Sequence, residues 1–202
     1  LSANTYTLTP PTSNSSGVWT FVSSDSSIVS IAGNTATLYQ VGAVTITASQ
    51  SASGNFGASG TATMRFTVLP ATPTLATWGN IEKSFGEATF NLTPPSSSSA
   101  GTWSYVSSNP TVATITGNNV TILGAGQTTI IATQAANWNW SEATTQLTLN
   151  VLPITPTISG FTALTAVVGD PAITITAPTS NSTAPWTYTS SNSNIATISG
   201  GT

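Results

Sequence analysis

The feature that most constrains this chain is a short segment that occurs three times. It begins at Trp19, Trp103 and Trp186, at spacings of 84 and 83 residues, and reads WTFVSSD, WSYVSSN and WTYTSSN. Of the 32 residues in 19–50, 13 are identical at the equivalent positions of 103–134, without a gap. A period of this length predicts a tandem array of similar structural modules.

The ends of the modules are marked by proline-containing segments. Val68-Leu-Pro70 recurs as Val151-Leu-Pro153, and a second proline follows each of them. Proline removes a backbone donor and favours extended chain before it, so these segments read as linkers. We therefore expect three domains: 1–70, a repeat lacking its first strand; 71–153, a complete repeat; and 154–202, a repeat truncated before its last strands. This phase suggests a window on a longer array, with a processed fragment as the alternative.

Within the middle repeat, apolar residues alternate with Ser, Thr or Asn at a period of two, and turn residues interrupt every eight to twelve positions. About seven short strands per repeat predict an all-β chain of tandem immunoglobulin-like β-sandwich domains, about 83–84 residues each. The recurring Trp19, Trp103 and Trp186 are predicted to be structural core residues, plugs between the two sheets. The alternative for these rings is a platform for stacking sugars.

Charge is nearly absent. Five acidic and two basic residues make up 3% of the chain, which contains no His and no Cys. Two cations cannot neutralise a nucleic-acid backbone, so no nucleic-acid partner is expected. The residues of zinc, thiol and Ser-His chemistry are missing, and the acidic residues are scattered. We expect no enzyme, no catalytic residue, no metal and no cofactor. No apolar run is long enough for a membrane span.

A family resemblance appears in the middle repeat. Ser107-Ser-Asn-Pro-Thr-Val-Ala-Thr-Ile115, then Gly124-Ala-Gly126 and Thr128-Thr-Ile-Ile-Ala-Thr133, occur in this order. They resemble the group 2 bacterial immunoglobulin-like domains of invasin- and intimin-type adhesins. The resemblance implies stalk modules of surface adhesins, and similar modules also decorate phage capsids and tails.

One segment stands out as a candidate site. Asn137-Trp138-Asn139-Trp140 places two indole rings beside two amides. If the segment is extended, both rings lie on the same face, an arrangement suited to holding sugars. The structural alternative is a loop that caps the sandwich or contacts the neighbouring domain. Both interpretations, ligand binding and interdomain contact, remain open at this stage.

The sequence favours a structural function. Rigid modules joined by short linkers behave as a semi-stiff rod. We expect spacer or stalk repeats of a long extracellular filament or adhesin at the cell surface. The alternatives are a fibre or capsid or tail decoration on a virion surface, and a carbohydrate-binding accessory module. Expected partners are neighbouring repeats of the same chain, laterally associated copies paired through edge strands poor in lysine, and a surface glycan or host receptor bound by a tip outside this sequence.

Overall fold

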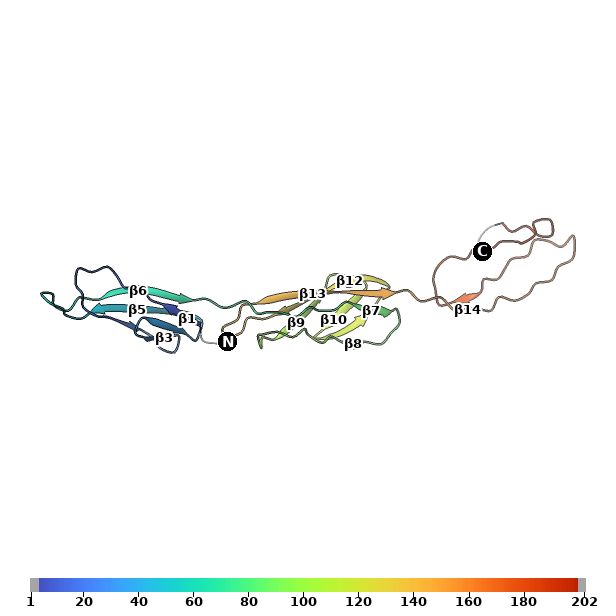
Figure 1. Cartoon of the computed structure of the whole chain (residues 1–202). Coiled ribbons are helices and arrows are strands. Elements are labelled where there is room, and N and C mark those ends of the chain that lie inside the picture. The colour runs from blue at the N-terminus through green and yellow to red at the C-terminus, as the bar shows by residue number, and fades with distance from the viewer. Residues whose placement is uncertain (1–3, 200–202) are drawn as a thin grey trace. The chain divides into compact units, whose positions relative to one another are not determined.

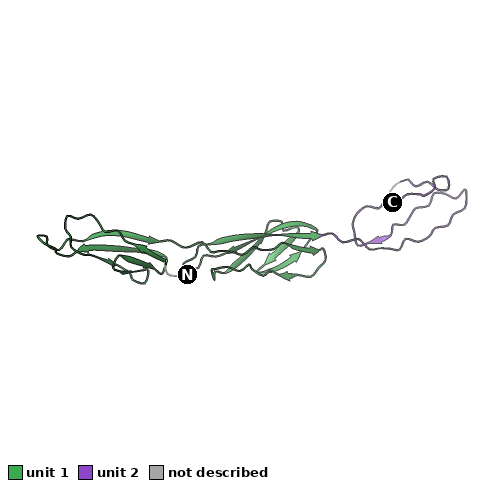
Figure 2. Ribbon diagram, in the orientation of Figure 1, with its two compact units in different colours: residues 1–151 green, residues 152–202 purple. Residues whose placement is uncertain are grey.

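The computed structural model describes residues 4–199, and over this range the chain is all-β, with strands β1 to β15 and no helix. Two compact units divide it, Leu1–Val151 and Leu152–Thr202 (Figure 2). The first unit contains the first two repeats, each with its own pair of sheets. The second unit contains the third.

The first repeat is a sandwich of two three-stranded antiparallel sheets (Figure 1). One sheet has the order β1-β4-β3 and the other the order β2-β5-β6. The strands are β1 (Asn4–Thr7), β2 (Trp19–Ser23), β3 (Val29–Ala32), β4 (Thr35–Leu38), β5 (Gly42–Gln50) and β6 (Ala62–Val68).

The core of the first repeat lies between these two sheets. Val29 and Ala36 come from the first sheet, Val44 and Ile46 from the second, and all four are buried. Along β5 buried residues alternate with more exposed ones, as expected for a strand with one face in the core. The alternation therefore turns one apolar face of each sheet inward, and burial of these two faces stabilises the sandwich.

The second repeat has the same plan with one more strand. Its sheets have the orders β10-β11-β8 and β7-β13-β12-β9. The strands are β7 (Ile81–Ser84), β8 (Phe90–Asn91), β9 (Trp103–Ser107), β10 (Ala113–Thr116), β11 (Asn119–Ile122), β12 (Gly126–Gln134) and β13 (Ala143–Leu152).

The additional strand changes the burial of its neighbour. In the second repeat β7 covers the edge of β13, whereas in the first repeat β6 pairs only with β5 among the described residues. Met64 on β6 occupies the position of Leu147 on β13, since they are opposite Ile46 and Ile130 respectively. Leu147 is buried, but Met64 is exposed.

The core of the second repeat centres on the long hairpin of β12 and β13. Ile130, Leu147 and Leu149 are buried there against Ala113 and Val120 of the facing sheet. Trp78 and Tyr105 pack against this cluster, with ring centroids 5.9 Å apart. The indole Nε1 of Trp78 donates to the carbonyl of Thr93 at 2.9 Å, so its polar atom is satisfied.

The recurring tryptophans lie elsewhere than expected. Trp19, Trp103 and Trp186 are each half-buried, and neither core cluster contains them. Trp103 is the first residue of β9 and pairs with Gln134, the last residue of β12, so it stands at one end of the sheet. This corrects the predicted plug: in the second repeat the tryptophan that packs on the core is Trp78.

At the same end of the sandwich, a glutamine side chain is buried. Gln134 accepts a hydrogen bond from Ser97 Oγ at 2.6 Å and donates to the carbonyls of Ser99 and Gly101 at 2.9 and 3.1 Å. Gln50 makes the equivalent three bonds in the first repeat. The amide thus fastens the loop before β9 to the end of β12 and satisfies its own polar atoms. A Cβ at Gly101 would lie 2.0 Å from the carbonyl oxygen of Ala135, so this loop requires glycine.

The third repeat forms little sheet in this chain. Its described residues pair only β14 (Ile158–Ser159) with β15 (Thr179–Ser180). The same pairing occurs in the second repeat as the bridge between Leu75 and Ser97. Trp186–Ser190, which corresponds to β9, pairs with no other strand among the described residues. Phe161 nevertheless stacks on Tyr188 at 6.2 Å, in the positions of Trp78 and Tyr105.

Candidate functional site: the junction of the first two repeats

The junction begins where the linker after Pro70 meets the loop between β12 and β13. Ala71 forms a parallel bridge with Trp140. The amide of Ala71 donates to the carbonyl of Asn139 at 2.8 Å, and the amide of Ser141 donates to the carbonyl of Ala71 at 2.9 Å. Pairing of this kind orders a linker that would otherwise be solvated. The linker is therefore attached to the repeat that follows it.

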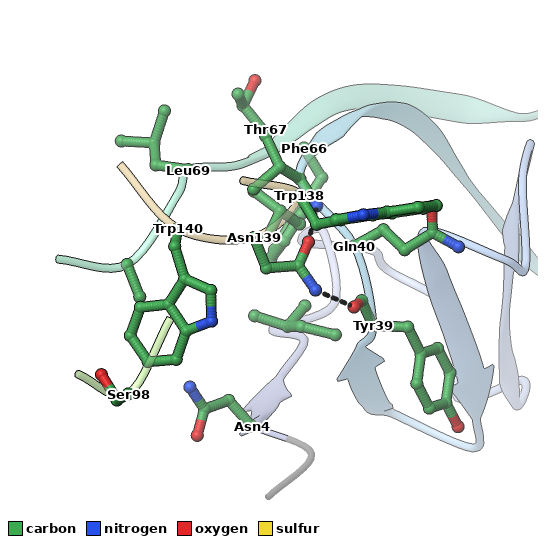
Figure 3. Close-up of a pocket in the computed structure, with 14 residues that line it drawn as sticks. Asn4, Tyr39, Gln40, Phe66, Thr67, Leu69, Ser98, Trp138, Asn139 and Trp140 are labelled. Atoms are coloured by element: carbon green, nitrogen blue, oxygen red, sulfur yellow. Dashed lines mark hydrogen bonds between the residues drawn. The ribbon is translucent and has the colours of Figure 1, made fainter. Parts of the chain in front are cut away.

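The side chain of Asn139 binds the first repeat. Its Nδ2 donates to the carbonyl of Tyr39 at 2.8 Å, and the amide of Val41 donates to its Oδ1, also at 2.8 Å (Figure 3). Tyr39 and Val41 lie in the turn between β4 and β5, so one amide reproduces the two bonds of a β-bridge. We call this pair of bonds the Asn139 clasp. Because its partners are backbone atoms, the amide orientation is unambiguous.

The loop that presents Asn139 is a tight turn. Asn137 and Trp140 exchange two backbone hydrogen bonds, at 3.0 and 2.9 Å, around the central pair Trp138-Asn139. The segment is not extended, so the two-residue alternation that would align the two indole rings does not apply. Figure 3 shows the rings of Trp138 and Trp140 pointing in different directions. The condition on which the two rings would share one face, an extended segment, is therefore not met.

Trp138 has an unusual backbone conformation. Its φ is 49°, and among residues 4–199 it is the one non-glycine residue with positive φ. The first repeat has the same turn between Ser53 and Phe56, with Gly54 in the equivalent position at φ 59°. A positive φ at the first central residue and not at the second is the pattern of a type II′ turn, which favours glycine there. Trp138 is therefore strained, and its side chain is 85% exposed.

A cleft of about 810 Å³ lies at this junction. Four aromatic rings line it, two from each repeat: Tyr39, Phe66, Trp138 and Trp140. The polar side chains in its wall are amides and hydroxyls, among them Gln40, Thr67 and Ser98. No Asp, Glu, Lys or Arg is among its lining residues. The cleft is thus aromatic, polar and uncharged.

Two charged clusters involve residues that do not line this cleft. Lys83 Nζ and Glu87 Oε2 form an ion pair at 2.9 Å, and the hydrogen bond from Lys83 lowers the pKa of Glu87. The Ser27 hydroxyl donates to Asp25 at 2.6 Å and lowers the pKa of that carboxyl. No group of three or more acidic side chains that could hold a metal occurs within the described range. The same range contains no helix long and apolar enough to cross a membrane.

Sequence reasoning singled out only one side of the junction. Asn137 closes the turn, Asn139 binds the first repeat, Trp140 bridges the linker, and Trp138 remains exposed. The other side, Tyr39 to Val41, was missed because it takes part through its backbone, which leaves no residue-type signal. For the Asn139 side, the sequence offered one further signal: Asn55 stands in the turn of the first repeat where Asn139 stands in the second.

No model of a protein family matches this sequence, and no curated protein matches it. Solved structures with weak similarity include the surface layer protein SbsC, domains 1–6 (20% identity, 70% of this chain and 21% of that chain, TM-score 0.31), and SbsC domains 4 and 5 (18%, 66% and 76%, 0.30). Human protocadherin-24 EC1–2 is similar at 11% identity, over 68% of this chain and 83% of that chain, with a TM-score of 0.30. This chain spans about a fifth of the first of these.

Proposed function

We propose that this chain consists of spacer repeats of a long extracellular surface protein, with a mechanical and display role and without catalysis. The junction carries the proposal. Two hydrogen bonds attach the linker at Ala71 to the loop of Asn139. Two more, in the Asn139 clasp, attach that loop to the first repeat. A joint built in this way transmits orientation from one module to the next, which a spacer requires.

The modules are proposed to be of the group 2 bacterial immunoglobulin-like kind found in the stalks of invasin- and intimin-type adhesins. The support is the order of motifs in the second repeat. Ser107-Ser-Asn109 starts at the last residue of β9, Ala113–Thr116 is β10, and Gly124-Ala-Gly126 leads into β12. These motifs fall at a strand, a strand end and a turn of the β-sandwich, in the same order as in the sequence of the family that the chain resembles.

Composition supports a place outside the cell. A surface built from Ser and Thr with 3% charged residues offers few sites to trypsin-like proteases and few groups to titrate. Lateral association of chains belongs to the same proposal, because Ser- and Thr-rich edge strands with almost no charge lack the lysines that usually block edge-to-edge pairing. Monodisperse monomers at high concentration in analytical ultracentrifugation would argue against that association.

The test is immunogold electron microscopy with an antibody against the second repeat, applied to intact source cells and to the particles they release. Label along filaments on intact cells is the expected result. Label on capsids or tails would assign the same spacer role to a virion. Label confined to the cytoplasm of sectioned cells would contradict the proposal.

A further inference from the structure

The exposed ring of Trp138 has no explanation in folding. A residue held at positive φ in a type II′ position costs stability, and the first repeat avoids that cost with Gly54 in the same turn. Burial of the ring does not offset this conformational cost, because the side chain is 85% exposed. Strain combined with exposure at one position is typical of a side chain that acts on something outside the fold.

The ring stands at the cleft of the junction rather than on an open surface. In Figure 3 it extends over the first repeat toward Gln40, near Phe66. Both repeats therefore contribute to the same wall, and the Asn139 clasp below holds them in place. The amide of Asn139 is itself used by that clasp, so polar contacts to a ligand fall to other side chains.

The chemistry of the wall selects the class of ligand. Exposed aromatic faces offer apolar contact, and the exposed side chains of Gln40 and Thr67 offer amide and hydroxyl groups for hydrogen bonds. A charged ligand would lose water without meeting an opposite charge, because no charged side chain lines the cleft. A neutral polyhydroxylated molecule has both the apolar faces and the hydroxyls that match this surface.

We propose that the cleft between the first two repeats binds a neutral polysaccharide, with Trp138 as the stacking platform and Gln40 as a polar contact from the opposite repeat. This goes beyond the spacer role: the junction that sets the geometry of the array also holds it to a glycan. Each repeat alone supplies only part of the wall, so binding requires the two repeats together.

The experiment is affinity electrophoresis of the full chain in native gels that contain hydroxyethylcellulose, xylan or galactomannan, with the anionic polymer alginate for comparison. We expect at least one neutral polymer to retard the chain and alginate not to. Trp138→Gly should weaken the binding about thirtyfold, as expected for loss of a central aromatic contact. Gln40→Ala should weaken it less.

The controls separate binding from folding. The melting temperature of Trp138→Gly should be no lower than that of the parent chain, because glycine adopts this φ without strain, as Gly54 does. Phe56→Ala removes an exposed ring from the equivalent turn of the first repeat and should leave retardation unchanged. The proposal is overturned if no neutral polymer retards the chain, if alginate is preferred, or if Trp138→Gly binds like the parent. None of these outcomes alters the immunogold result on which the spacer role depends.

Discussion

Ile130 and Ile131 are neighbours on β12 that differ only in which face of the sheet they occupy. Ile130 is completely buried between the two sheets, and Ile131 is 38% exposed. Ile130→Ala should lower the free energy of unfolding by about 2–5 kcal/mol, because it removes core contacts and leaves a cavity. Ile131→Ala, the matched control, should cost less than about 1 kcal/mol. Urea denaturation of the full chain checks both, and equal losses would contradict the assigned register.

Gln134 is the buried polar residue on which the end of the second sandwich depends. Gln134→Leu preserves bulk but leaves Ser97 and the carbonyls of Ser99 and Gly101 without their partner. We expect a loss of about 1–3 kcal/mol in the free energy of unfolding. Gln127→Leu, on the exposed part of the same strand, serves as the control and should be near neutral. If Gln134→Leu left the free energy of unfolding unchanged, water would have to replace the amide as the partner of these groups.

At the scale of elements, the turn between β12 and β13 is what joins one repeat to the next. Asn139→Ala removes the two bonds of the Asn139 clasp and keeps the backbone bridge at Ala71. We expect each repeat to keep its fold while the orientation of the two repeats becomes broadly distributed.

Double electron–electron resonance tests this expectation by measuring the distance between spin labels on Thr45→Cys and Thr144→Cys. Both positions are exposed, on β5 and β13. The chain has no other cysteine to interfere. The parent should give a narrow distance distribution and Asn139→Ala a broad one. Asn55→Ala, which changes the equivalent turn of the first repeat, should leave the distribution narrow. A narrow distribution in Asn139→Ala would show that the bridge at Ala71 suffices.

For the whole molecule, the scarcity of charge predicts stability that is insensitive to salt. The ion pair between Lys83 and Glu87 is the one salt bridge found within residues 4–199, and both side chains are partly exposed. Screening therefore has almost nothing to remove. Between about 0.05 and 1 M sodium chloride, the melting temperature should move by less than about 2 °C. Calorimetry checks this, and a large shift would reveal electrostatic contacts that the fold does not show.

Stability should also be constant over a wide range of pH. The pKa values of Glu87 and Asp25 are lowered in the fold from 4.5 and 3.8, so their contribution is present above these values and is lost as pH falls through the lowered ones. Burial raises the pKa of Tyr105 above 10.0, so above pH 10 the unfolded chain loses that proton first and stability falls. Melting temperatures across pH should show one plateau, and a midpoint near neutrality would contradict it.

The all-β class and the two-layered sandwich could be predicted from the sequence. These properties are encoded locally: alternation places Ile130 inward and Ile131 outward, and the turn residues set the strand lengths. The position of Trp103 could not be predicted this way, because recurrence shows that a residue matters to each module without showing where its ring lies. Pairing of β9 with β12 decides that, by placing Trp103 opposite the last residue of its partner.

The sequence by itself determined the all-β class and the scarcity of charged residues, which directs any ligand toward neutral chemistry; module boundaries near Pro70 and Pro153 remain its prediction. Only the tertiary structure decided how Asn137 to Trp140 is used. A closed turn separates the two rings, commits Asn139 to the backbone of Tyr39 and Val41, and leaves Trp138 strained and exposed. The physical reason is that the partners of Asn139 are backbone peptide groups about 100 residues away. Because every residue carries a peptide group, no pattern of side chains can predict which ones it binds.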